Sequence, residues 1–321
     1  MNINQNESDK DIILSNNSKV AKYSSESFKK GLNLATKIEN IDLNNQYKYW
    51  FNEGIHGLRE YRKALVSFDK ALKINPENAD CWYWHGKTLF ELIYLEKDLT
   101  SIYKFYEPVP YKRELEKALV SFDKALKINP ENPDYWYWQG KTLSELIYLE
   151  KALFSFDKAL NINPENGDYW WWKGNTLCTL EEFEKALISF DKALKINPNI
   201  DYGWDGWHAY SVASYYSKEY KKSLIAINKI LKIKPDHDCF WFFQGLTLCD
   251  LREYEKALIS FRKALKINSD NADYWYWQGK TLYDLERYQE ALTCLEQALK
   301  IDPEHDLAKT LLHQLNQELL L

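Results

Sequence analysis

One phrase is repeated along this chain of 321 residues. Ser-Phe-Asp-Lys-Ala-Leu-Lys-Ile-Asn-Pro-Glu-Asn begins at Ser67 and again at Ser121, and close copies begin at Ser155, Ser189 and Ser260. The prolines that close the phrase are Pro76, Pro130, Pro164, Pro198, Pro235 and Pro303. They give a basic period of 34 residues, with a 20-residue insertion in one unit and a 3-residue insertion in another. Such a period predicts an array of stacked units, each too small to bury its apolar faces alone.

Each unit has the apolar spacing of two helices. In the last unit, Trp275, Gly279 and Leu282 follow one helical face, and Tyr288 and Ala291 begin the face of a second helix. The Asn-Pro dipeptides between units disfavour continued helix. The sequence therefore predicts one helical hairpin per unit.

Four kinds of residue recur at fixed places in these hairpins. The first helices carry a Trp column, which consists of Trp82, Trp136, Trp170, Trp207, Trp241 and Trp275. They also carry a small-residue column, which consists of Gly86, Gly140, Gly174, Ser211, Gly245 and Gly279. The second helices carry Ala64, Ala118, Ala152, Ala186, Ser223, Ala257 and Ala291, and then Phe68, Phe122, Phe156, Phe190, Ile227, Phe261 and Leu295. Small residues allow two helices to approach closely, and we expect the Trp and Phe columns to fill the space beside them.

A 34-residue hairpin with this Trp, Gly, Ala, Phe and closing Pro resembles the tetratricopeptide repeat, or TPR. The resemblance covers residues 45–305, and it implies an all-α, right-handed α-solenoid of about seven TPR hairpins with a C-terminal capping helix. The second unit, 79–132, carries the insertion near 95–114, which we expect to be a lengthened helical hairpin. The expected flanking parts are a flexible segment at 1–22, a capping helix or vestigial repeat at 23–44, and the capping helix at 306–321.

Composition excludes several classes of function. The formal net charge of −5 does not favour a nucleic acid partner. No apolar stretch is long enough for a transmembrane helix, and residues 1–10 lack the features of a signal peptide, so we expect a cytoplasmic protein without a membrane partner. The five cysteines are scattered, which predicts neither a disulfide framework nor a zinc site. His237-Asp238-Cys239 is the tightest group of potential ligands, and we do not expect it to bind a metal.

The repeated tripeptide Gly-Lys-Thr, at Gly86, Gly140 and Gly279, invites comparison with a phosphate-binding loop. Such a loop needs another Gly five residues earlier, after a strand, whereas this chain has Cys or Tyr there in a predicted helix. No nucleophile–base pair or carboxylate dyad interrupts the repeat pattern. We therefore expect no enzymatic activity, no cofactor and no metal.

The resemblance implies that the first helices line a concave groove for a peptide or helix of a partner protein. The predicted groove residues are Tyr83, Lys87, Tyr137, Lys141, Trp171, Asn175, Phe242, Tyr276 and Lys280. Aromatic side chains bury a large area at low entropic cost, which favours them as anchors. The aromatic residues Trp84, Trp138, Trp172 and Trp277 are expected to pack between adjacent helices. Asp side chains stand where a TPR clamp on a chaperone's terminal carboxylate would need Lys, so that mode is not favoured.

The predicted function is a non-catalytic scaffold or adaptor that binds a protein or peptide. One alternative is a regulatory subunit that docks to an enzyme through the 95–114 hairpin and the caps. The tip of that hairpin would present Tyr103, Phe105, Tyr106 and Tyr111. Another alternative is a self-assembling array, a homo-oligomer formed through its end faces, because the chain finishes in Glu-Leu-Leu-Leu.

Overall fold

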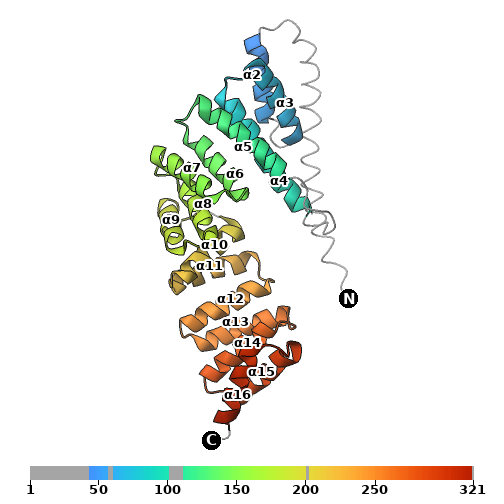
Figure 1. Ribbon diagram of the computed structural model, residues 1–321, viewed down its shortest axis with the longest axis vertical. Helices are drawn as coiled ribbons and strands as arrows, with labels where there is room; N and C mark the ends of the chain where they lie inside the picture. Colours follow the sequence, from blue (N-terminus) through green and yellow to red (C-terminus); the bar gives the residue numbers. More distant parts are fainter. Residues whose placement is uncertain (1–42, 57–60, 101–110, 200–201, 320–321) are drawn as a thin grey trace. The chain divides into compact units, whose positions relative to one another are not determined.

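The computed structural model describes residues 43–56, 61–100, 111–199 and 202–319, and within these ranges it is all-helical (Figure 1). The first helices of the hairpins are α2 (Leu43–His56), α4 (Ala79–Thr100), α6 (Pro133–Glu145), α8 (Gly167–Thr179), α10 (Gly203–Tyr216), α12 (Asp238–Asp250) and α14 (Ala272–Asp284). The second helices are α3 (Tyr61–Ile74), α5 (Tyr111–Ile128), α7 (Leu149–Ile162), α9 (Phe183–Ile196), α11 (Tyr220–Ile233), α13 (Tyr254–Ile267) and α15 (Tyr288–Ile301). The final helix is α16 (Asp306–Glu318). These pairs confirm an α-solenoid of helical hairpins.

The chain forms two compact units, residues 1–129 and 130–321. In the unit of residues 130–321, each second helix packs against the first helix of its own hairpin and against the first helix of the next one. Neighbouring first helices also contact each other, for example α6 with α8 and α8 with α10. The helices of this unit therefore form two layers, which we call the first-helix layer (α6, α8, α10, α12, α14) and the second-helix layer (α7, α9, α11, α13, α15).

Local sequence determines where the helices begin and end. Asn132 and Asn166 lie directly before α6 and α8, and the side chain of each accepts a hydrogen bond from a backbone N–H of the first turn. Inside the hairpins, the turn passes through a residue in the left-handed region, with φ of 63° at Ile147 and 60° at Glu181. The N–H of the next residue then reaches back into the first helix, as Tyr148 does to the carbonyl of Leu143 at 2.9 Å.

Small residues and phenylalanines form the core of each hairpin. A Cβ at Gly174 would lie 2.8 Å from the ring of Phe190, and a Cβ at Gly245 would lie 2.4 Å from the ring of Phe261. Both phenylalanines are completely buried. Each glycine is therefore required by the close approach of the two helices, which confirms the packing role predicted for these columns.

The hairpin of α10 and α11 solves the same packing problem with different residues. Ser211 and Ile227 replace the usual Gly and Phe, and both are fully buried. Ser214 and Ser223 are also fully buried, and their hydroxyl groups have no hydrogen-bond partner within the described part of the chain. Buried polar groups without partners reduce stability, so we expect these two serines to destabilise this hairpin.

The insertion lengthens both helices of the second hairpin. Helix α4 has 22 residues and α5 has 18, whereas α6 has 13 and α7 has 14. Residues 101–110, which include three of the four predicted tip residues, lie outside the described ranges.

Helix α16 covers the end of the array. It packs on α14 and α15 and buries Leu311 and Leu315, while Leu307 on the same helix is 58% exposed. None of the helices in the described ranges is both long and apolar enough to cross a membrane.

Candidate interaction surface

The side chains of the Trp column lie at the turn before each first helix, next to the second helix of the same hairpin. The indole N–H of Trp170 donates to the carbonyl of Pro164 at 2.8 Å, and that of Trp136 donates to Pro130 at the same distance. A lysine of the second helix lies over the ring, as Lys192 does at 4.1 Å from the ring centroid of Trp170. These contacts are local to each hairpin and give the Trp column a structural role.

Three of the predicted groove aromatics are buried within the protein. Tyr137 is 9% exposed, Trp171 is 1% exposed and Tyr276 is 7% exposed. Tyr137 lies against the ring of Tyr169 from the next first helix, with 4.9 Å between ring centroids. Burial raises the pKa of the Tyr137 hydroxyl well above its ordinary value. Partner contact at these three positions stays a prediction. In the free protein these side chains are buried where neighbouring hairpins pack together.

Trp171 is covered by Tyr202, which lies just after the three-residue insertion. The two rings stack with 3.6 Å between centroids and 9° between planes. Gly206 permits this arrangement, since a Cβ there would lie 2.7 Å from Cβ of Tyr202 and 2.9 Å from the indole nitrogen of Trp171. Sequence reasoning missed Tyr202 because it stands outside the 34-residue register.

The other predicted groove residues that the structure describes are half-buried. Tyr83 and Lys87 belong to α4, Asn175 to α8, Phe242 to α12 and Lys280 to α14. Lys87 lies over the ring of Trp84 at 4.8 Å, and Lys280 pairs with Asp284 at 2.8 Å. Tyr83 also approaches the ring of Phe122 on α5, with 6.3 Å between centroids, and Phe242 contacts the rings of Phe261 and Tyr274.

Lys141 is the predicted residue with the most distinctive surroundings. Its ammonium nitrogen lies 4.2 Å from the ring centroid of Trp138 on its own helix and 4.4 Å from that of Trp172 on α8. Both indoles are half-exposed, so they are accessible as well as packed between helices. Asp168 is close enough that Lys141 opposes the rise in its pKa that burial causes. We call Trp138, Lys141, Asp168, Trp172 and Asn175 the α6–α8 surface.

Carboxylates occupy the first turn of every first helix in residues 130–321. They are Asp134, Asp168, Asp205, Asp238 and Asp273. Asp134 and Asp238 each accept a hydrogen bond from a tyrosine of the next first helix, Tyr169 and Tyr274. Negative charge is favoured at a helix N-terminus, so these carboxylates stabilise the helices and join neighbouring hairpins.

The group His237, Asp238 and Cys239 keeps its ligand atoms within 4.8 Å of one another. Asp238 already accepts hydrogen bonds from Tyr274 and from Asn268. These contacts give Asp238 a role in joining hairpins, and nothing about the group points to a bound ion.

Comparison with known proteins identifies the repeat. Family models described as tetratricopeptide repeats match residues 133–166, 167–200 and 272–305, and a further TPR model matches residues 245–285. A search of curated protein sequences finds no significant match.

Solved structures with the same fold include the TPR protein YrrB, whose structure is described as having an unusual peptide-binding site. YrrB is 25% identical with a TM-score of 0.54, and the match covers 59% of this chain and 96% of YrrB. A tetratricopeptide repeat protein from Parabacteroides merdae is 17% identical with a TM-score of 0.47, covering 84% of this chain and 99% of that one. MamA from Desulfovibrio magneticus is 17% identical with a TM-score of 0.46, covering 54% and 97%. The matched hairpins and the fold shared with YrrB agree, and this chain contains tetratricopeptide repeats.

Proposed function

We propose that this chain is a non-catalytic scaffold that binds a segment of a partner protein along the first-helix layer of residues 130–321. The observation that carries the proposal is the α6–α8 surface. Lys141 is held over two half-exposed indoles from neighbouring hairpins, with Asp168 and Asn175 on the next helix. Aromatic faces beside fixed polar groups are typical of sites that anchor peptides.

The family supports the same proposal. Tetratricopeptide repeats serve protein and peptide interactions, and YrrB is a TPR protein with a peptide-binding site. The buried Tyr137 supports this surface because its ring packs on Tyr169 of α8, and the buried Trp171 packs α8 on Phe190 of α9. Their replacement would disturb packing as well as binding, so a test needs the accessible residues instead.

The test is a selection of displayed random peptides on the full chain, followed by anisotropy titrations of the selected peptides. Lys141→Ala removes the charge between the two indoles and is expected to weaken binding by about tenfold. The matched control is Lys309→Ala, which removes an exposed lysine that pairs with Glu304 on the C-terminal side of the array. Equal affinity of the wild type and Lys141→Ala for every selected peptide would reject this surface.

A second candidate is self-association through the C-terminal end of the array. Leu307 is 58% exposed and Leu319 is 38% exposed on the last helix and at its end. If these side chains form an end-to-end contact, light scattering across a dilution series will show a mass that rises with concentration and that Leu307→Glu returns to the monomer value. A constant monomer mass for the wild type removes this candidate.

A further inference from the structure

The first helices depart from the tetratricopeptide pattern at one position. The pattern has a Leu three residues after its Trp. In this chain every unit with the Trp has a polar or phenolic side chain there instead, namely His85, Gln139, Lys173, Tyr210, Gln244 and Gln278. A departure that recurs in each unit is a property of the whole array and requires a structural explanation.

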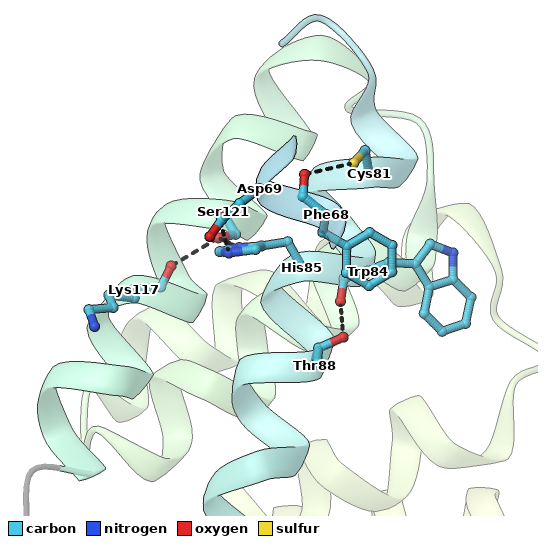
Figure 2. Close-up of polar contacts among 8 residues, drawn as sticks. All are labelled: Phe68, Asp69, Cys81, Trp84, His85, Thr88, Lys117 and Ser121. Atoms are coloured by element: carbon cyan, nitrogen blue, oxygen red, sulfur yellow. Dashed lines mark hydrogen bonds and ion pairs between the residues drawn. The ribbon is translucent and has the colours of Figure 1, made fainter. Parts of the chain in front are cut away.

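Four of these side chains, His85, Lys173, Tyr210 and Gln244, contact the second helix of the preceding hairpin, whereas Gln139 accepts a hydrogen bond from Ser155 of its own hairpin. Lys173 pairs with Asp157 at 2.5 Å, and Gln244 donates to the side-chain oxygen of Asn228 at 2.7 Å. Tyr210 makes the equivalent contact with Asp191. In residues 1–129, Figure 2 shows His85 between Asp69 at 3.4 Å and Ser121 at 2.9 Å.

Because the side chain at this position extends toward the neighbouring helix, it does not fill the space that the Leu of the family pattern would fill. In residues 130–321 a groove of about 430 Å³ lies between α7 and α9. Trp170, Lys173 and Leu177 of α8 form its floor, and its walls include Leu153 and Ile188. The groove therefore combines the apolar side chains of Trp170 and Leu177 with the Lys173–Asp157 ion pair, and charged residues line most of its rim.

The unit of residues 1–129 contains the same groove at equivalent residues. It lies between α3 and α5, has a volume of about 560 Å³, and has Trp82, His85 and Leu89 of α4 as its floor. Leu65 and Val120 stand in its walls at the places of Leu153 and Ile188. Its recurrence in a separate compact unit indicates that the repeat itself builds the groove.

Exposed apolar side chains follow the same surface from hairpin to hairpin. Phe154, Ile188, Ile225 and Ile259 stand at one equivalent position of α7, α9, α11 and α13, and each is between 55% and 57% exposed. Single exposed apolar residues are ordinary, but here one member stands at the same position in four successive hairpins, so the row follows the stacking of the array. Val66 and Val120 hold the same position in the other unit and are similarly exposed.

Positive charge surrounds the part of this row that lies on α11 and α13. Helix α11 contains Lys221, Lys222, Lys229 and Lys232 and no acidic residue. Helix α13 contains Lys256, Arg262, Lys263 and Lys266 against the single carboxylate of Glu255. The first helices, in contrast, carry the row of aspartates described above. The two layers therefore differ in the sign of charge they present.

We propose that the second-helix layer of residues 130–321 is a second docking surface, and that its occupant is an acidic amphipathic segment of a partner protein. Apolar side chains of that segment enter the groove above Trp170 and lie along the isoleucine row, while its carboxylates face the lysines of α9 and α11. Apolar burial supplies affinity and charge complementarity selects an acidic partner. A groove with an indole floor fits individual anchor side chains, which favours a protein segment over a lipid surface. This surface is distinct from the first-helix layer of the proposed function.

The test uses the full chain and peptides selected from a displayed random library, then synthesised with a fluorescent label. The expected peptides carry net negative charge with Leu, Phe or Trp anchors, and Ile188→Asp weakens their binding by about tenfold. Lys173→Leu restores the family residue, fills the groove, and is expected to weaken binding to a similar extent while the thermal midpoint is maintained. Gln278→Leu is the matched control, because it makes the same kind of exchange on α14, where the next second helix, α15, has no member of the isoleucine row.

The outcomes separate this proposal from the first one. Peptides that lose affinity with Lys141→Ala and not with Ile188→Asp support the proposed function and contradict the second surface. The second docking surface is also contradicted if the selected peptides carry no net negative charge. It is contradicted as well if their affinity is unchanged for both Ile188→Asp and Lys173→Leu. Vesicles containing phosphatidylserine provide the last arm. The decisive result there is that the wild type sediments with these vesicles, that Ile225→Asp does not, and that acidic peptides fail to compete. That combination of results would assign the second-helix layer to a membrane instead.

Discussion

The turn inside each of five hairpins requires one residue to adopt a left-handed backbone conformation. Ile147, Glu181, Lys218, Arg252 and Glu286 all have φ between 58° and 63° at equivalent turns. Side chains with a Cβ are disfavoured in this region, and β-branched ones most of all. Ile147 is also 75% exposed, so its side chain gains little from packing in compensation.

Ile147→Gly is therefore expected to stabilise the protein by about 1 kcal/mol, because glycine adopts this conformation without steric cost. Urea unfolding followed by circular dichroism measures the change. The control is Ile188→Gly, an equally simple exchange at an exposed residue inside α9, which should destabilise. A loss of stability at both positions would show that Ile147 is not strained.

Thiol reactivity is a second property that single residues determine. Burial raises the pKa of Cys81 to about 12 and the pKa of Cys294 to about 11, while Cys239 is exposed. The thiolate is the reactive form, so we expect Cys239 to react first with an aromatic disulfide reagent at mildly alkaline pH. Cys81 and Cys294 should react only after denaturant opens their hairpins. Mass spectrometry of peptides after timed labelling identifies the sites, and early labelling of Cys81 would contradict its burial.

At the scale of helices, much of the fold follows from the sequence. Phe156, Phe190 and Gly174 lie in a regular 34-residue register, and their packing depends mainly on residues of the same hairpin. Contacts between hairpins were less predictable. The exposure of Trp171 depends on Tyr202, and the positions of aromatics on a helix do not reveal which ring a neighbouring unit will cover. An aromatic residue fits a buried junction and an open groove equally well, so the sequence predicts Tyr137 and Tyr276 as groove residues and does not predict their burial between hairpins in the free protein.

The paired columns of two helices can be tested as a unit. Gly174→Ser brings a Cβ within 2.8 Å of Phe190, and we expect it to cost about 1–3 kcal/mol of unfolding free energy. Adding Phe190→Ile should recover part of that loss, because Ser211 and Ile227 form the same pair in the hairpin of α10 and α11. Denaturant titrations of the single and double variants give the coupling. Strictly additive losses would mean that the two columns do not constrain each other.

At the scale of the whole molecule, stability is distributed from neighbour to neighbour. In an array of this kind, each hairpin is stabilised by its own packing and by the interface with the next one. Helix α16 is the last such interface, and Leu315 is completely buried there.

Leu315→Ala is expected to destabilise the C-terminal end by about 2–4 kcal/mol. Because hairpins communicate only through their neighbours, the amides of α14 and α15 should lose hydrogen-exchange protection while those of α6 and α7 keep theirs. Hydrogen exchange with mass spectrometry measures both regions in one experiment. Uniform loss of protection across residues 130–319 would indicate a single cooperative unit instead.

The sideways contacts of the first helices also fix the order of the hairpins. Lys173 meets an aspartate on the helix before it, Gln244 meets an asparagine, and His85 meets another aspartate. If the hairpin of α8 and α9 were moved to follow α13, Lys173 would face Arg262, which stands at the place of Asp157. The hairpins that begin with α8 and α12 are therefore not interchangeable despite their similar sequences, because each has a polar pair with its own predecessor.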